Sequence, residues 1–338
     1  MRVWIILVTA VMAMAAIPVS AAELSARKLD LAVPGGRLIN VADRVFVLAG
    51  NGALFGVTGD GQVIEKPGPE RLLESDPLPY SLVKDGRVEI SPDGLIRAWY
   101  SGETKSYGHG ALGDAVEALS LVVQEEGGKP AIYTMMADEV FEDLQPRIVD
   151  LDRALAGRPE IVTITASPAG GAGIAVFGLG RNSDGDPALL RLASSVRIGA
   201  PYRWLNIAGI ADFDGDGFTE IAYVDRPHIR GELVFLEWRG GRLREQAREG
   251  GYANHHGGST VQDLSEVADV DGDGNPDLIL PVRGYGAIAA VSLAADGQRR
   301  IAEVDILSAP RSRIISTSAQ SAVYLDRDGA LHEIRWAP

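Results

Sequence analysis

Two short acidic loops carry the most specific chemistry that this sequence offers. Each is nine residues long, with carboxylates at positions 1, 3, 5 and 9 and glycine at positions 4 and 6. Alternating acids on a tight loop direct their oxygens toward one point, and four carboxylates left without a cation there would repel strongly. The carboxylates are Asp212, Asp214, Asp216 and Glu220 in the first loop and Asp269, Asp271, Asp273 and Asp277 in the second.

The ligands available in these loops predict calcium. Glycine at position 6 permits a sharp turn, and the backbone carbonyl at position 7, from Phe218 or Asn275, can add a ligand. A flexible loop offering about six or seven oxygens suits calcium better than magnesium, which demands a stricter octahedron. We therefore expect about two calcium ions, one in each loop, with a structural rather than a catalytic role.

An EF-hand shares the first half of this spacing but needs a bidentate glutamate at position 12 and flanking helices. Position 12 is Tyr223 in the first loop and Leu280 in the second, and both lie in apolar runs typical of strands. The sequence therefore excludes an EF-hand. Acidic turns without metal are the other interpretation, and two copies in a matching frame argue against it.

The two loops belong to a longer internal repeat. Residues 204–243 align without gaps on residues 261–300 at an offset of 57, so that Asp212 falls on Asp269 and Gly240 on Gly297. The pattern of apolar and turn residues in the first copy predicts four strands, at 205–211, 220–224, 232–238 and 242–248. One such unit cannot bury both of its faces, whereas several units stacked radially can, as in a β-propeller.

Weaker copies extend the series along the chain. Residues 147–163 keep the first two acids of the loop and its ending, a glycine followed three residues later by an acid. Residues 89–99 keep only an Asp-Gly turn. At the two ends of the chain, residues 37–57 resemble residues 313–335. The last unit lacks a fourth strand, which residues 27–33 could supply and so close the ring. Residues 113–126 could form a short helix, but we expect a strand at 118–124. The count predicts an all-β propeller of six four-stranded blades. Seven blades are the alternative, because residues 67–90 are hard to assign to particular strands of the repeat.

An acidic loop followed directly by Glu-Ile-Ala-Tyr-Val or Asp-Leu-Ile-Leu-Pro resembles the FG-GAP, or VCBS-type, repeat of integrin-α-like propellers. The resemblance is clearest over residues 204–300 and degenerate over 147–190. It implies that the loop joins the first two strands of a blade and binds calcium. The implied ligands are Asp212, Asp214, Asp216, the Phe218 carbonyl and Glu220, and then Asp269, Asp271, Asp273, the Asn275 carbonyl and Asp277.

The loop at 150–160 departs from this pattern because it has two extra residues and lacks the third acid. We expect no tight metal site there, although Asp150, Asp152 and Glu160 could hold a metal weakly.

The N-terminus predicts export. Arg2 precedes an apolar run, Pro18 ends it, and small residues at 19–22 suit signal peptidase, so we expect residues 1–22 to be a signal peptide and residues 23–338 to form a single propeller domain. We expect no membrane span after cleavage. The chain contains no cysteine, and its large apolar content can form a core without disulfides. These features favour a bacterial periplasmic or secreted protein.

The net charge of −14 disfavours nucleic acid as a partner, because a negative surface repels phosphate backbones. No nucleophile elbow, P-loop, zinc-protease motif or dinucleotide fingerprint is present in the sequence. We therefore favour a non-enzymatic module that binds a protein or glycan. The alternative is a hydrolase or lyase, acting on a polysaccharide or phosphoester at the mouth of the propeller.

The ligand face is predicted from where aromatic, histidine and arginine residues fall in the repeat. If the acidic loops join strands one and two, the connections between strands two and three and between successive units lie on the opposite face. Four of the five histidines fall in those connections, with His332 in a strand, and such side chains are typical of recognition surfaces. A transition metal held by three of the histidines is a further hypothesis. The predicted ligand-binding residues are Tyr107, His109, Tyr202, Arg203, Trp204, His228, Asn254, His255, His256, Arg283 and Tyr285.

Overall fold

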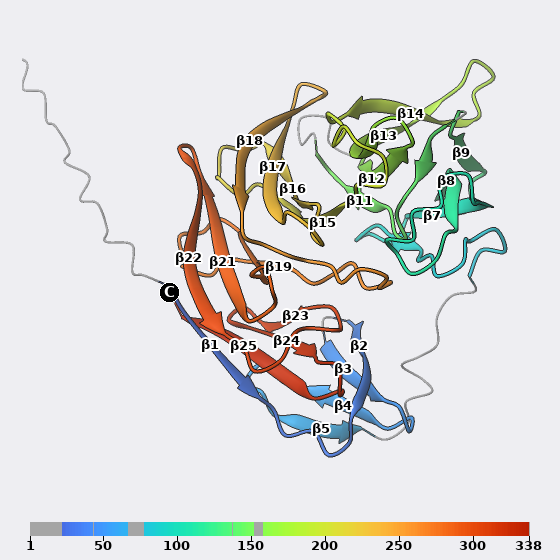
Figure 1. The fold of residues 1–338 in the computed structure, drawn as a ribbon. Helices are drawn as coiled ribbons and strands as arrows, with labels where there is room; N and C mark the ends of the chain where they lie inside the picture. The colour runs from blue at the N-terminus through green and yellow to red at the C-terminus, as the bar shows by residue number, and fades with distance from the viewer. Residues whose placement is uncertain (1–21, 43, 67–77, 137, 152–157, 338) are drawn as a thin grey trace, which may run out of the picture.

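The computed structural model describes residues 22–42, 44–66, 78–136, 138–151 and 158–337. Within these ranges every regular element is a β-strand, and the strands pair antiparallel, so the expected all-β class is confirmed. The sheets are arranged around a common centre (Figure 1). The signal peptide predicted at residues 1–22 lies outside the described residues except for Ala22.

In the described part of the chain, no helix combines the length and the hydrophobicity that crossing a membrane requires.

Three sheets have four strands each, arranged in the order in which they occur along the chain. They are β2 (Gly35–Val41), β3 (Arg44–Ala49), β4 (Leu54–Val57) and β5 (Val63–Lys66); β15 (Leu205–Ala211), β16 (Thr219–Asp225), β17 (Glu232–Arg239) and β18 (Arg242–Gly250); and β19 (Glu266–Ala268), β20 (Asp277–Pro281), β21 (Ala287–Ala294) and β22 (Gly297–Asp305). The last two sheets are the two copies of the clear repeat, and all four strands predicted in the first copy are present.

A fourth sheet joins the two ends of the described chain. Its order is β1 (Glu23–Lys28), β25 (Leu331–Ala337), β24 (Ser321–Leu325) and β23 (Ile315–Ser318). The N-terminal region does supply the missing strand, but the predicted position, 27–33, is wrong: β1 runs from Glu23 to Lys28 and pairs with β25. Leu29, Leu31 and Val33 instead pack into the core beside β2–β4, which explains why their alternation resembled a strand.

The fifth sheet contains nine strands. It comprises β6 (Glu89–Ile90), β7 (Ile96–Thr104), β8 (Glu117–Glu125), β9 (Pro130–Thr134), β10 (Val140–Phe141), β11 (Arg147–Val149), β12 (Glu160–Ser167), β13 (Gly171–Arg181) and β14 (Pro187–Ser194). The short strand β10 pairs with both β8 and β12 and so joins two sequential runs, β6–β9 and β11–β14. Residues 117–125 are a strand rather than a helix, as we expected for 118–124.

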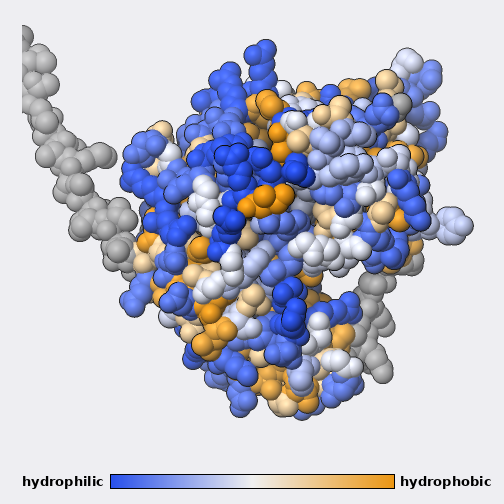
Figure 2. Space-filling view, in the orientation of Figure 1, coloured by the Kyte–Doolittle hydropathy of each residue, from blue (hydrophilic) through white to orange (hydrophobic). Residues whose placement is uncertain are grey.

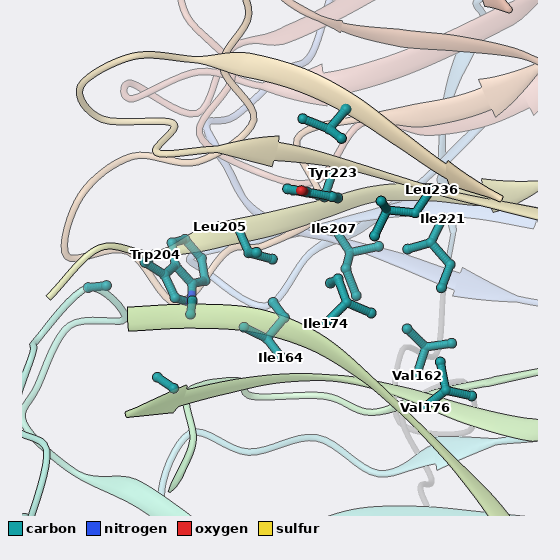
Figure 3. Packing of buried hydrophobic residues seen from close by; sticks show 14 of the residues in the cluster. Val162, Ile164, Ile174, Val176, Trp204, Leu205, Ile207, Ile221, Tyr223 and Leu236 are labelled. Carbon is teal, nitrogen blue, oxygen red and sulfur yellow. The ribbon is translucent and has the colours of Figure 1, made fainter. Parts of the chain in front are cut away.

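Burial within a sheet explains why these sequences form these strands. Every residue of β12, β16 and β20 is buried, because each of these strands is covered on both faces. Consecutive apolar residues therefore occur in each strand, as at 161–162, 221–224 and 278–280. In contrast, most of β18 is exposed. Figure 3 shows the core between two sheets: Val162, Ile164 and Ile174 face Trp204, Ile207 and other apolar side chains of the neighbouring sheet.

The connection between β18 and β19, residues 251–265, ties distant parts of the ring together, and we call it the central connection. Its Gly258 N–H donates to the Ala111 carbonyl over 2.9 Å, and its Asp263 carbonyl accepts from the Ile314 N–H over 2.8 Å. Gln262 Nε2 donates to Asp143 Oδ1 over 3.0 Å. The central connection therefore positions several sheets at once.

Candidate functional site

The two acidic loops fold alike. In the first, the Phe213 N–H donates to Glu220 Oε2 over 2.8 Å; in the second, the Val270 N–H donates to Asp277 Oδ2 over the same distance. Three further backbone-to-carboxylate bonds also occur in both loops. In the first loop, the N–H groups of Gly217, Asp216 and Phe218 donate to Asp212, Asp214 and Asp216, respectively. In the second loop, the N–H groups of Gly274, Asp273 and Asn275 donate to Asp269, Asp271 and Asp273, respectively. The loops connect β15 to β16 and β19 to β20, as predicted.

Backbone conformation accounts for the glycines at positions 4 and 6. Gly215 and Gly217 have φ of 72° and 88°, and Gly272 and Gly274 have φ of 75° and 93°. A residue with a Cβ is strained in this left-handed region, whereas glycine is not. Two such turns in succession bring the carboxylates at positions 1, 3 and 5 to the same side of the loop.

The carboxylate oxygens gather closely enough to surround a cation. Asp212, Asp214 and Glu220 each offer one oxygen within 4.8 Å of the others, and so do Asp269, Asp271 and Asp273. Glu220 is fully buried, and its Oε1 has no hydrogen-bond partner. A buried carboxylate oxygen without a partner is costly, so this donor set fits a hard divalent cation such as calcium.

The electrostatics of the loops agree with that fit. Burial, followed by the charges of neighbouring acids, raises the pKa of Glu220 to about 8, while burial raises the pKa of Asp277 to about 7. The pKa values of Asp214 and Asp271 are also raised, chiefly by burial and further by the neighbouring aspartates. Without a cation the folded loops therefore disfavour their charged form, which bound calcium would stabilise.

The first loop has two neighbours that the second lacks. Glu237, directly opposite Glu220 in the β16–β17 register, forms a further group with Asp216 and Glu220. The Arg239 guanidinium lies 3.8 Å from the centre of the Phe218 ring and 3.9 Å from Asp216. Sequence reasoning missed both residues because only the strand register brings them to the loop. At an offset of 57, their counterparts in the second copy are Ala294 and Asp296.

The degenerate loop before β12 keeps one feature of the complete loops. Glu160 is buried and accepts a hydrogen bond from the Leu151 N–H over 2.9 Å, which is the bond that Glu220 and Asp277 make. Asp150 is exposed, and Asp152 lies outside the described residues. The weak metal site suggested for Asp150, Asp152 and Glu160 therefore stays a prediction.

The histidines of the predicted ligand face lie in the expected connections. His228 is between β16 and β17, His255 and His256 are in the central connection, and His109 is between β7 and β8. In an antiparallel sheet, these connections lie at the end opposite to the acidic loops. His332 lies in β25 and bonds to Asp326 over 2.9 Å.

Three connections converge on one cavity of about 570 Å³. It is lined by His228 from the β16–β17 connection, His255 and His256 from the central connection, and Arg283 and Tyr285 from the β20–β21 connection. The His256 and Tyr285 rings stack with their centres 4.0 Å apart, and Arg283 is exposed. The cavity thus combines flat rings with a positive charge.

Hydrogen bonding fixes the protonation of these histidines. His255 Nε2 lies 2.9 Å from the Ser259 carbonyl, which can only accept, so Nε2 carries the hydrogen. His255 Nδ1 then accepts from His228 Nε2 over 2.8 Å. Burial lowers the pKa of His255 to about 3 and also lowers the pKa of His228. The described residues contain no metal-binding group that includes a histidine, so the structure adds no support for the transition-metal hypothesis.

A second cluster lies beside this cavity. The Tyr107, His109 and Tyr202 rings lie within 5.3–5.9 Å of one another. His109 Nδ1 is 2.5 Å from Glu142 Oε1, and Glu142 is fully buried, with its pKa raised by burial and by Asp143. Glu142 was not among the predicted residues, because its contact with His109 depends on the pairing of β10 with β8.

The remaining predicted residues support these loops. Trp204 is buried in the core between sheets and donates from Nε1 to the Glu142 carbonyl over 2.9 Å. Asn254 is fully buried, and its amide donates to the carbonyls of Asn206 and Ile207. Arg203 is exposed and bonds to the Tyr202 carbonyl. Trp204 and Asn254 are therefore buried residues whose hydrogen bonds stabilise the connections of the ligand face.

Residues 212–280 match the family model of the FG-GAP-like repeat. No curated protein sequence matches the chain. Among solved structures, the complex of the fission yeast SREBP–SCAP binding domains is 10% identical, with a TM-score of 0.41, covering 95% of this chain and 75% of that one. BBS1N, in complex with ARL6DN, is 12% identical, with a TM-score of 0.39 and coverages of 91% and 93%. A Lactobacillus plantarum protein is 12% identical, with a TM-score of 0.42 and coverages of 87% and 78%.

The identity of the repeat rests on the family match, which spans both acidic loops and the strands between them. Residues 212–280 are therefore an FG-GAP-like repeat, within a chain whose antiparallel sheets are arranged as a β-propeller.

Proposed function

We propose that this protein is an exported, calcium-stabilised β-propeller that acts as a non-enzymatic interaction module. The observation that carries the proposal is the convergence of His228, His256, Arg283 and Tyr285 on one cavity, at the end of the sheets opposite to the acidic loops. Aromatic and arginine side chains in a concave site are what recognition surfaces use. The partner is a protein or a glycan that reaches this face.

In this proposal calcium has a structural role. Bound calcium would neutralise the converging carboxylates of each loop and fix the start of β16 and of β20. Glu220 and Asp277 would each have two roles. One carboxylate oxygen already accepts a hydrogen bond from the backbone N–H of the second residue of the loop, and the other oxygen would bind calcium. Rigid β16 and β20 would in turn hold the β16–β17 and β20–β21 connections that line the cavity.

We further propose six blades. Four sheets have four strands each, and the runs β6–β9 and β11–β14 within the nine-stranded sheet would supply two more blades, with β10 between them.

For export, the position of β1 supports removal of the predicted signal. The strand begins at Glu23, so cleavage after Ala21 or Ala22 leaves it complete. Ala22 itself is buried beside Leu24 in the core at this edge, which favours cleavage after Ala21.

Site-specific crosslinking tests the proposed face. A photo-crosslinking residue at the exposed position Arg283 should capture a specific protein or glycan partner, whereas the same residue at the exposed Arg244 of β18 should not. The variant His109→Ala/His228→Ala/His256→Ala should fold and bind calcium but lose that partner. Equal capture from both positions would contradict a ligand face at the cavity.

A further inference from the structure

A second cavity, of about 530 Å³, lies where the first strands of several sheets begin. Its charged lining consists of five arginines and one aspartate: Arg37, Arg87, Arg147, Arg311, Arg313 and Asp263. Arg37 belongs to β2 and Arg147 to β11, while the others immediately precede β6, β19 or β23. Residues far apart in the sequence thus bring positive charge together in a protein whose net charge is −14.

Two of these arginines are held in place by the protein. Arg87 donates from Nη1 to Asp263 Oδ2 over 2.9 Å and from Nη2 to the Thr260 carbonyl over 3.0 Å. Arg147 donates to Asp143, which is fully buried at the side chain. Their guanidinium groups are therefore already oriented, and a ligand that meets them would order little more of the protein.

The other three arginines of the cavity are Arg37, Arg311 and Arg313. No carboxylate of the described residues forms an ion pair with Arg37, Arg311 or Arg313. The Nε of Arg313 is buried and makes no hydrogen bond. A buried donor without an acceptor is costly, and an anion in the cavity would supply that acceptor.

The acids around the cavity do not cancel this charge. Asp263 is already paired with Arg87. Glu89 accepts from the Gln145 amide, and Glu266 from the Ser316 N–H. Burial raises the pKa of both glutamates, so each keeps its negative charge less readily than a solvated glutamate.

We propose that this arginine-lined cavity binds a small molecule carrying two or more oxyanion groups. The guanidinium fork matches the paired oxygens of carboxylate, phosphate and sulfate, and arginine keeps its charge at any physiological pH. The cavity has the volume of a small-molecule site. The negative charge of the whole molecule opposes nucleic acids and anionic membranes, which would have to approach a wide surface.

The test uses the mature protein and the fluorescent probe 1,3,6-naphthalenetrisulfonate, in a fixed excess of free calcium so that the acidic loops do not change. We expect saturable binding of one probe per chain that weakens as salt rises from about 50 mM to about 500 mM. The variant Arg37→Gln/Arg311→Gln/Arg313→Gln should weaken binding at least tenfold, since it removes about three charge-assisted hydrogen bonds. If it fails to fold, Arg37→Gln/Arg311→Gln, with both positions exposed, replaces it.

The control is Arg242→Gln/Arg244→Gln, on the exposed strand β18, which removes as many positive charges as the double cavity variant without touching the cavity. Binding unchanged in the cavity variant, or weakened equally in the control, overturns the proposal. The variant His228→Ala, which changes the ligand-face cavity but not the arginine-lined cavity, should bind the probe normally, and this separates the two sites. Displacement by tricarballylate or by tripolyphosphate supports the proposal and identifies carboxylate or phosphate as the preferred group; displacement by neither contradicts it.

Discussion

The side chain of Asn275 lies against Gly215, so the two acidic loops touch. A Cβ added to Gly215 would come within 2.3 Å of Asn275 Oδ1. Asn275 is position 7 of the second loop, where its backbone carbonyl is a proposed calcium ligand, and Gly215 is position 4 of the first. We therefore expect a change in one loop to affect the other.

We predict that Gly215→Ala destabilises the protein and disturbs the second loop, because it adds a collision to the strain of a left-handed alanine. The control is Gly217→Ala, which has φ of 88° but open space around the added Cβ. Adding Asn275→Ala to each variant forms a double-mutant cycle, measured by thermal unfolding. Asn275→Ala should restore the part of the stability of Gly215→Ala that the collision removes, and it should show no such coupling with Gly217→Ala. The absence of coupling with Gly215→Ala would contradict contact between the loops.

Arg239 should weaken calcium binding at the first loop. Its guanidinium is 3.9 Å from Asp216, and a positive charge at this distance opposes a second cation. We expect Arg239→Gln to raise calcium affinity severalfold at one site by isothermal titration calorimetry, while Arg239→Lys, which keeps the charge, changes it little. Similar gains in both variants would mean that packing against Phe218, and not charge, is responsible.

The histidine pair predicts a loss of stability in acid. His255 has its pKa lowered to about 3 in the folded state, whereas an unfolded histidine titrates near 6.5. The folded state therefore binds fewer protons, and this contribution to stability is complete above pH 6.5 and lost progressively as the pH falls below it. Protonation would also set two N–H groups against each other between His228 and His255.

We therefore expect the melting temperature to fall less between about pH 7 and about pH 5 in His255→Gln than in the unmodified protein. Comparing the two proteins at each pH cancels the titration of the carboxylates, which both retain. A fall of equal size in both would show that His255 does not contribute to acid sensitivity.

Much of the fold could be predicted from local pattern. The acidic loops, their offset and the four strands of each clear copy follow from turn residues and apolar spacing, which are local properties. The extent of β1 could not be predicted from local pattern, because it depends on the register with β25 and on the packing of Leu29 in a neighbouring core. Glu142 and Glu237 were missed for the same reason, since strand pairing alone brings them to His109 and Glu220.

Intact-mass measurement of the exported protein tests the predicted signal peptide. We expect a mature chain that begins at Ala22, since Ala22 packs in the core beside β1 and small residues precede it. A chain that begins at Glu23 would still agree with export and with a complete β1. Retention of residues 1–21 would contradict cleavage and indicate an N-terminal anchor.

Calcium titration tests the central claim most directly. We predict about two calcium ions per mature chain, and a melting temperature that falls in excess chelator, because a ligand bound only by the folded state stabilises that state. Asp214→Ala/Asp271→Ala should abolish both effects, while Asp184→Ala/Asp186→Ala, exposed before β14, should preserve them. An unmodified protein that binds no calcium and melts identically with and without chelator would contradict the account.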